Sequence, residues 1–244
     1  MKRGGFIFDG VDSETIKTLI QARPLIEAPL RKFEMKSTYG VDGQVPYDEG
    51  AYDNTSLELV LLVDGDDTIA DRQKLYNIMD SRGVYKDFIP YFDPDKIYRV
   101  MLSDSLQFEN TYMYGQKQSA SAKFTVKPYK YLVANAPVTI NGKTGSLTNP
   151  TNYVSQPKIK ITGTGPVTLT VNGIDFIIKN VPNTITIESE RYVAYQEDSN
   201  GILTPMNNQI GTREYPIFKP GANSIVATGN VTQLYIEPKW RSLV

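Results

Sequence analysis

Turn-forming residues interrupt this sequence every few positions, and their spacing is its strongest constraint on the fold. Gly, Pro, Asn and Asp bound short runs that are rich in Val, Ile, Thr, Tyr and Phe. Such runs are typical of β-strands, because β-branched and aromatic side chains fit a pleated, half-buried surface. We therefore expect a mainly β protein.

The N-terminal half is predicted to be β-rich with one helix. Residues 6–8 form a short opening strand, and residues 32–36 alternate outward charge with inward apolar side chains, as in a half-buried sheet. Residues 68–81 are predicted to form an amphipathic helix. Residues 37–54 hold too many turn residues for a continuous element, so we expect an exposed excursion. Gly115-Gln116 is a candidate hairpin turn between later strands.

The length of 244 residues favours two domains. Residues 134–152 are dense in turn signals and are predicted to contain the boundary, which gives domains at 1–133 and 134–244. The second domain reads as about seven short strands, which is typical of an antiparallel β-sandwich. The expected fold is thus a β-rich α+β domain followed by a β-sandwich.

Cysteine and histidine are both absent. Their absence excludes disulfides, thiolate metal sites and cysteine nucleophiles, and it removes the usual general base near neutral pH. The formal net charge of −1, with both signs spread along the chain, argues against tight nucleic-acid binding. No apolar run has the length of a signal peptide core or a transmembrane helix. We expect no cofactor, no metal, no membrane association and folding in the cytoplasm.

Two motifs resemble ligand sites but have simpler structural interpretations. The first is a set of acids that resembles a calcium loop: Asp64, Asp66, Asp67 and Asp71. This set lacks the central glycine, and Leu75 stands where the bidentate Glu belongs, so a capped helix start explains it. The second, residues 163–165, begins like a dinucleotide fingerprint, but Pro166 and a β-type run follow. We expect a turn there.

Two further features would suit a carbohydrate-active protein. Several acids of the second half could supply a glycosidase pair: Glu188, Glu190, Glu197 and Asp198. Acids that alternate along strands more often form a solvated sheet face, so we expect no enzyme. Trp240, the only tryptophan, could stack on a sugar, or it could lie in a terminal strand that closes the sandwich.

The C-terminal stretch carries two short motifs. Pro220-Gly221-Ala222-Asn223 precedes a strand, and Pro238-Lys239-Trp240-Arg241 follows it. This ending resembles that of siphophage distal tail proteins, with Lys239 where an arginine is common. The N-terminal half agrees in its order of a Phe-rich strand, an excursion, an apolar strand, one helix and Tyr- and Phe-rich strands. The resemblance covers nearly the whole chain.

The resemblance implies a structural protein of the phage tail tip. The N-terminal domain would form a hexameric ring that continues the tail tube, and the C-terminal domain would be a galectin-like sandwich. The implied partners are further copies of the chain, the tail tube protein and tail-fibre or receptor-binding proteins. DNA would pass through the bore without specific binding. The protein would belong to the virion after assembly in the bacterial cytoplasm.

A ring requires two different surface patches on each subunit. We expect the first strand and the 37–54 excursion to contribute to that interface, through Phe6, Phe8, Tyr39, Tyr47 and Tyr52. The tyrosines could instead pack beneath the excursion, because buried and interface tyrosines share the same amphipathic character. The alternative function is a monomeric carbohydrate-binding module protein, with or without weak carboxylate-based glycosidase activity.

Overall fold

The computed structural model describes residues 2–65, 68–109 and 117–244. The Gly115-Gln116 turn and two acids of the calcium-like set, Asp66 and Asp67, lie outside these residues. The chain divides into two compact units, Met1–Val133 with Leu243–Val244, and Ala134–Ser242. All assigned strand pairs are antiparallel, which confirms the mainly β prediction.

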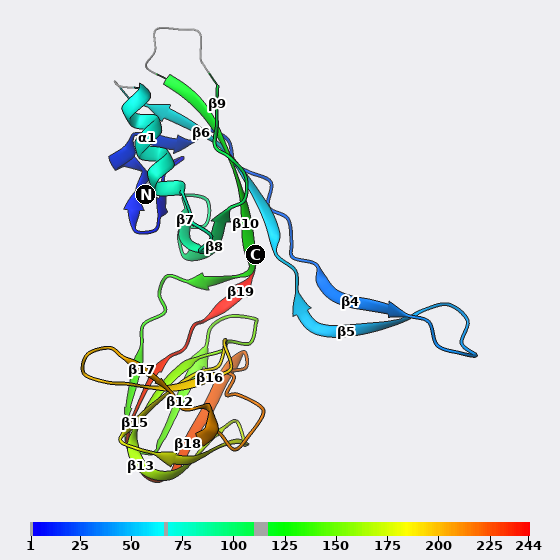
Figure 1. The fold of residues 1–244 in the computed structure, drawn as a ribbon, viewed down its shortest axis with the longest axis vertical. Helices are drawn as coiled ribbons and strands as arrows, with labels where there is room; N and C mark the ends of the chain where they lie inside the picture. Colours follow the sequence, from blue (N-terminus) through cyan, green and yellow to red (C-terminus); the bar gives the residue numbers. More distant parts are fainter. Residues whose placement is uncertain (1, 66–67, 110–116) are drawn as a thin grey trace. The chain divides into compact units, whose positions relative to one another are not determined.

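The first unit is built on a nine-stranded sheet (Figure 1). Its order is β2-β1-β7-β8-β10-β6-β3, and β9 and β19 also pair with β10. The strands are β1 (Phe6–Phe8), β2 (Val11–Asp12), β3 (Thr18–Ile20), β6 (Thr55–Asp64), β7 (Lys86–Pro90), β8 (Lys96–Leu102), β9 (Gln107–Glu109), β10 (Lys117–Leu132) and β19 (Arg241–Leu243). The final strand thus returns the chain to this sheet, where the Val244 N–H donates to the Pro128 carbonyl at 3.1 Å.

Alternation along β6 places Leu57, Leu59 and Leu61 in the core of the first unit. The helix α1 (Thr68–Met79) adds Leu75 and Met79, both fully buried, to that core. The predicted helix is present and ends at Met79. Its predicted apolar stripe was too wide, because Ile69 and Tyr76 are exposed and only the Leu75/Met79 side, four residues apart, faces the core. A 3-10 helix, η1 (Ser13–Ile16), precedes β3.

The second unit is built on an eight-stranded sheet. Its order is β11-β18-β13-β15-β16-β17, with β12 on β18 and β14 on β13. The elements are β11 (Val138–Asn141), β12 (Thr144–Asn149), β13 (Lys158–Val171), β14 (Ile174–Val181), β15 (Thr184–Glu188), β16 (Val193–Glu197), β17 (Leu203–Pro205), η2 (Asn207–Gln209) and β18 (Gly221–Glu237). Because β11 and β12 both pair with β18, much of the predicted boundary segment is sheet.

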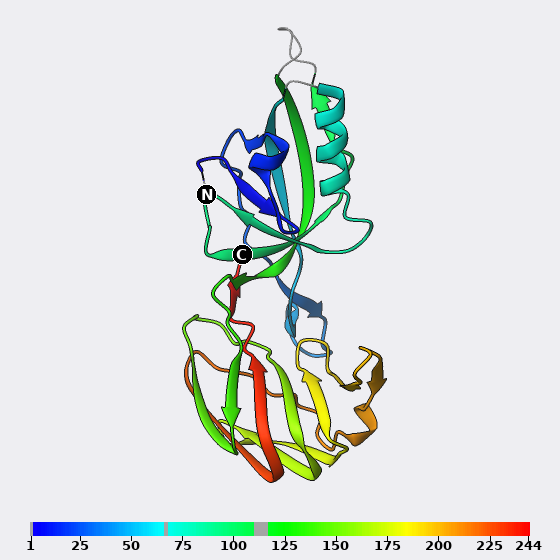
Figure 2. The same ribbon diagram turned by 90° about the vertical axis from the view of Figure 1, so that its left-hand side faces the viewer.

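Two long strands organise this unit (Figure 2). The sequence predicted two short strands in place of each, but β13 and β18 continue through register shifts near Gly163 and Val167. Glycine permits the irregularity, because Gly229 has φ +92° and a Cβ there would lie 2.3 Å from the Pro166 carbonyl oxygen. The residues predicted to form a turn at 163–165 therefore lie in a bulge within β13.

Asn172 and Gly173 form the predicted two-residue hairpin between β13 and β14. Their φ angles of 52° and 80° are both positive, as a type I′ turn requires, and Val171 pairs with Ile174. The Asn172 side chain also donates to Asn223 Oδ1 at 2.7 Å. The turn is therefore fixed both by its own backbone and by the start of β18.

Candidate functional site

The first unit carries an exposed two-stranded hairpin, which we call the arm (residues 31–52). It consists of β4 (Arg31–Lys36) and β5 (Val45–Tyr52) and extends away from the nine-stranded sheet (Figure 1). The strand predicted at 32–36 is present. The prediction that 37–54 has no continuous element was wrong, because β5 pairs with β4 despite Pro46 and Gly50. Gly50, at φ +75°, lies in the register shift between the strands, where an irregular backbone is accommodated.

Charged side chains hold the arm in shape. Arg31 donates to both oxygens of Asp48, at 2.9 and 2.7 Å, and the Gly50 N–H donates to the same carboxylate at 2.9 Å. These hydrogen bonds, that from Arg31 foremost, lower the pKa of Asp48. Arg31 also lies over the Tyr52 ring, 4.9 Å from its centroid. The base of the arm is therefore ordered by its own cross-strand contacts.

Apolar side chains on the arm are exposed on both of its faces. Phe33 and Met35 alternate with Glu34, which lies directly opposite Tyr47 on β5. Phe33 and Met35 are each about half exposed, so the prediction of a half-buried sheet was wrong here. The alternation is real, but no second layer covers the arm in the part of the chain that the structure describes.

The predicted interface residues fall into two groups. Phe6 and Phe8 are 0% exposed and lie in the first unit's core, where both rings pack on Phe88 at centroid distances of 5.9 and 6.3 Å. Their side chains are therefore core residues, which corrects the prediction that they contact another subunit. They alternate with Ile7, and the aromatic side chains of the strand face inward.

The three tyrosines belong to the arm. Tyr39 is 104% exposed and Tyr47 is 58% exposed, so packing beneath the excursion was wrong for both. Lys36 Nζ lies 4.5 Å from the centroid of the Tyr47 ring. Tyr52 packs edge-on against Tyr129 at 6.2 Å. Contact of these residues with a neighbouring subunit stays a prediction.

The features that suggested carbohydrate chemistry have structural roles. Trp240 is 8% exposed and packs on Phe218 at 5.6 Å, so it cannot serve as an exposed sugar platform. Lys239 pairs with both Glu188, at 3.2 Å, and Glu190, at 3.5 Å. The Asp198 carboxylate accepts from the Ile202 N–H and closes a turn.

Two searches of the described residues, 2–65, 68–109 and 117–244, bear on metals and membranes. Neither a cluster of three or more acids suited to a metal ion nor a helix long and apolar enough to cross a membrane is found among them. Asp71, one of the acids of the calcium-like set, is buried and pairs with Lys74 at 2.9 Å. Its partner is thus a cation of the same helix.

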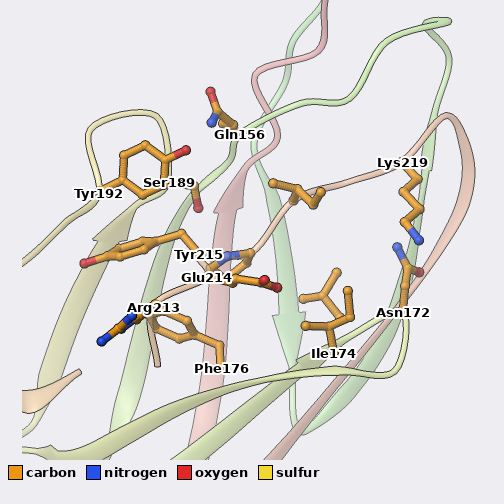
Figure 3. Close-up of a pocket in the computed structure, with 13 residues that line it drawn as sticks. Gln156, Asn172, Ile174, Phe176, Ser189, Tyr192, Arg213, Glu214, Tyr215 and Lys219 are labelled. Carbon is orange, nitrogen blue, oxygen red and sulfur yellow. The ribbon is translucent and has the colours of Figure 1, made fainter. Parts of the chain in front are cut away.

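The second unit contains a pocket of about 260 Å³ (Figure 3). Three aromatic side chains form one side, and Asn172 and Lys219 lie on the other. Sequence reasoning missed this pocket. Its walls come from the β13–β14 hairpin, the segment after β15 and the irregular segment 213–219, and no periodic pattern links such distant pieces.

Comparisons with known proteins give one informative match. No family model matches the chain, and no curated protein matches it. Among solved structures, a similar fold is that of SPP1 Dit (gp 19.1), described as a paradigm of hub adsorption apparatus in Gram-positive infecting phages. The TM-score is 0.67 at 17% sequence identity, over 98% of this chain and 99% of that chain. This chain therefore shares, over its full length, the fold of a phage Dit protein.

Proposed function

We propose that this protein is a structural hub of a siphophage tail tip, which assembles into a ring through its arm. The fold shared with SPP1 Dit over 98% of the chain carries this proposal. The match spans both units, so it concerns the order and kind of the whole set of elements. The C-terminal motifs of the sequence resemble the same family independently of the fold.

The arm supplies a physical reason for assembly. A two-stranded hairpin is marginally stable at best in water when nothing packs on it. The arm nevertheless keeps several apolar side chains exposed: Phe33, Met35, Tyr39, Val41, Val45 and Tyr47. Seating these on a neighbouring subunit would bury both the hairpin and the apolar area, at about 25 cal/mol per Å². Because the receiving surface differs from the arm, the contact is heterologous and generates a ring when its rotation closes.

The finer features of the hub follow from the family resemblance. The ring is a hexamer with a second unit of galectin-like type, built in the bacterial cytoplasm and carried in the virion. It contacts the tail tube protein on one side and tail-fibre or receptor-binding proteins on the other. DNA passes through the bore, and a chain with a formal net charge of −1 would not hold it. The protein acts by assembly and requires no cofactor.

Native mass measured at increasing protein concentration tests the proposal. A hexamer of the 27.3 kDa chain has a mass of roughly 164 kDa. The double variant Phe33→Ser with Tyr47→Ser removes one apolar side chain from each face of the arm. It should raise the concentration at which rings form by about tenfold or more, as expected for interface anchors.

The matched control is Ile202→Ser with Leu203→Ser, which removes two similarly exposed apolar side chains from the second unit. It should leave assembly unchanged. A wild-type chain that stays monomeric at every concentration would contradict self-assembly through the arm. Equal loss of rings in both double variants would show that general surface apolarity, not the arm, drives association.

A further inference from the structure

We propose that the pocket of the second unit binds a single saccharide ring. This site is separate from the arm and does not depend on ring assembly. Its volume of about 260 Å³ lies below the range of about 300–1,000 Å³ that is typical of drug-sized ligands. The space therefore suits one six-membered ring with its substituents.

Aromatic side chains form a corner on one side of the pocket. The rings of Tyr192 and Tyr215 meet at 83° with centroids 5.4 Å apart, and Phe176 lies 5.1 Å from Tyr215 beneath them. Phe176 is buried and Tyr192 is exposed, so the corner extends from the core to the surface. Flat aromatic faces of this kind pack well against the C–H face of a sugar ring.

Polar side chains around this corner have no partners within the described part of the chain. Arg213, Glu214 and Lys219 make no ion pair or side-chain hydrogen bond there, although opposite charges line the same pocket. Figure 3 shows the Glu214 carboxylate between the aromatic side and Lys219. The pocket thus offers both uncommitted donors and an uncommitted acceptor.

A buried hydroxyl adds an independent observation. Ser189 lines the pocket and is 0% exposed, and its Oγ has no hydrogen-bond partner in the described structure. A buried hydroxyl without a partner costs about 1–3 kcal/mol, so such groups normally have one. A hydroxyl-bearing ligand supplies that partner directly or through a water.

These groups distinguish between ligand classes. An apolar side chain from a partner protein would desolvate Arg213 and Glu214 without pairing them, which is unfavourable. A phosphate group would bring its charge close to the Glu214 carboxylate. A neutral sugar presents an apolar face to the tyrosines and hydroxyls that both donate and accept. The mixture of aromatic, cationic, anionic and hydroxyl groups therefore favours a saccharide.

Saturation-transfer difference NMR on the full chain tests this proposal, because it reads ligand signals whether the protein is a monomer or a ring. D-glucose, D-galactose and N-acetyl-D-glucosamine are each titrated through the millimolar range. At least one should give saturable transfer. Tyr192→Ala should weaken that binding by about fivefold or more, equivalent to about 1 kcal/mol, and Glu214→Gln should weaken it in the same direction.

The controls lie in the same unit but outside the pocket. Tyr235→Ala and Glu197→Gln should bind as the wild type does, and the Trp240 emission of every variant reports whether its unit is folded. Absence of saturable transfer from all three sugars would overturn the proposal, as would unchanged affinity in Tyr192→Ala. Tighter binding of N-acetyl-phenylalaninamide than of any sugar would also overturn it and assign the pocket to a protein side chain.

Discussion

Replacing Phe218 by alanine should destabilise the second unit by about 3–5 kcal/mol, the usual cost of deleting a fully buried phenylalanine side chain. Phe218 is 0% exposed, and its ring packs on Trp240 at a centroid distance of 5.6 Å with an interplanar angle of 51°. About 0.5–1.5 kcal/mol of the loss belongs to this aromatic pair. The backbone bridge to Ser155, with N···O distances of 2.9 and 3.0 Å, persists in the variant because it involves no side chain of residue 218.

Urea unfolding followed by tryptophan fluorescence measures this effect locally. Trp240 is the only tryptophan of the chain, so its emission reports the second unit alone. With a denaturant slope near 2 kcal/mol per M, the midpoint should fall by roughly 1.5–2.5 M. The native emission of the variant should also shift to longer wavelength, because the neighbour that shields the indole is gone.

Two comparison variants sharpen the test. Phe218→Leu keeps most of the volume and should cost less than about 1.5 kcal/mol. Ile202→Ala, at an exposed position, should stay within about 0.5 kcal/mol of the wild type. A midpoint for Phe218→Ala that matches the Ile202→Ala value would refute the assignment of Phe218 and Trp240 to the core of this unit.

Two further predictions concern pH and backbone strain. Burial, and then the hydrogen bond to Asp93, raise the pKa of Tyr98, so the folded state keeps the phenol proton at a pH where the unfolded chain releases it. The wild type should therefore lose stability relative to Tyr98→Phe as the pH rises above about 10, and parallel urea midpoints of the two proteins across that range would contradict this. Gly229→Ala should cost more than Gly165→Ala, because both have positive φ but only Gly229 has a carbonyl oxygen 2.3 Å from the new Cβ. The Gly165 variant should cost about 1–2 kcal/mol, and equal midpoints for the two would be inconsistent with a close approach at the bulge.

Local chemistry made part of the fold predictable. The Asn172-Gly173 turn follows from the two positive φ angles that these residues tolerate, and the helix at α1 follows from its run of helix-compatible residues between breakers. Long-range pairing was harder. Nothing in the sequence shows that β13 continues through residues 163–166, because its neighbour at the bulge, Gly229, is far away along the chain.

The roles of aromatic residues were the least predictable feature. Phe8 and Tyr47 both lie on strands that alternate, yet Phe8 is in the core and Tyr47 is exposed. Cores and interfaces are both enriched in aromatic side chains, so the local pattern does not separate them. Trp240 shows the same limit, since the ring that buries it, Phe218, belongs to a segment without periodicity.

The two surfaces proposed to be functional differ in what they leave unsatisfied, and this difference makes them separable. The arm exposes apolar side chains on a hairpin without a covering layer, which a second protein surface would bury. The pocket instead surrounds its aromatic corner with uncommitted polar groups, which a hydroxyl-rich ligand would satisfy. Phe33→Ser with Tyr47→Ser should therefore impair assembly while leaving sugar transfer intact, and Tyr192→Ala should do the reverse. If either variant changed both readouts, the arm and the pocket could not be independent sites.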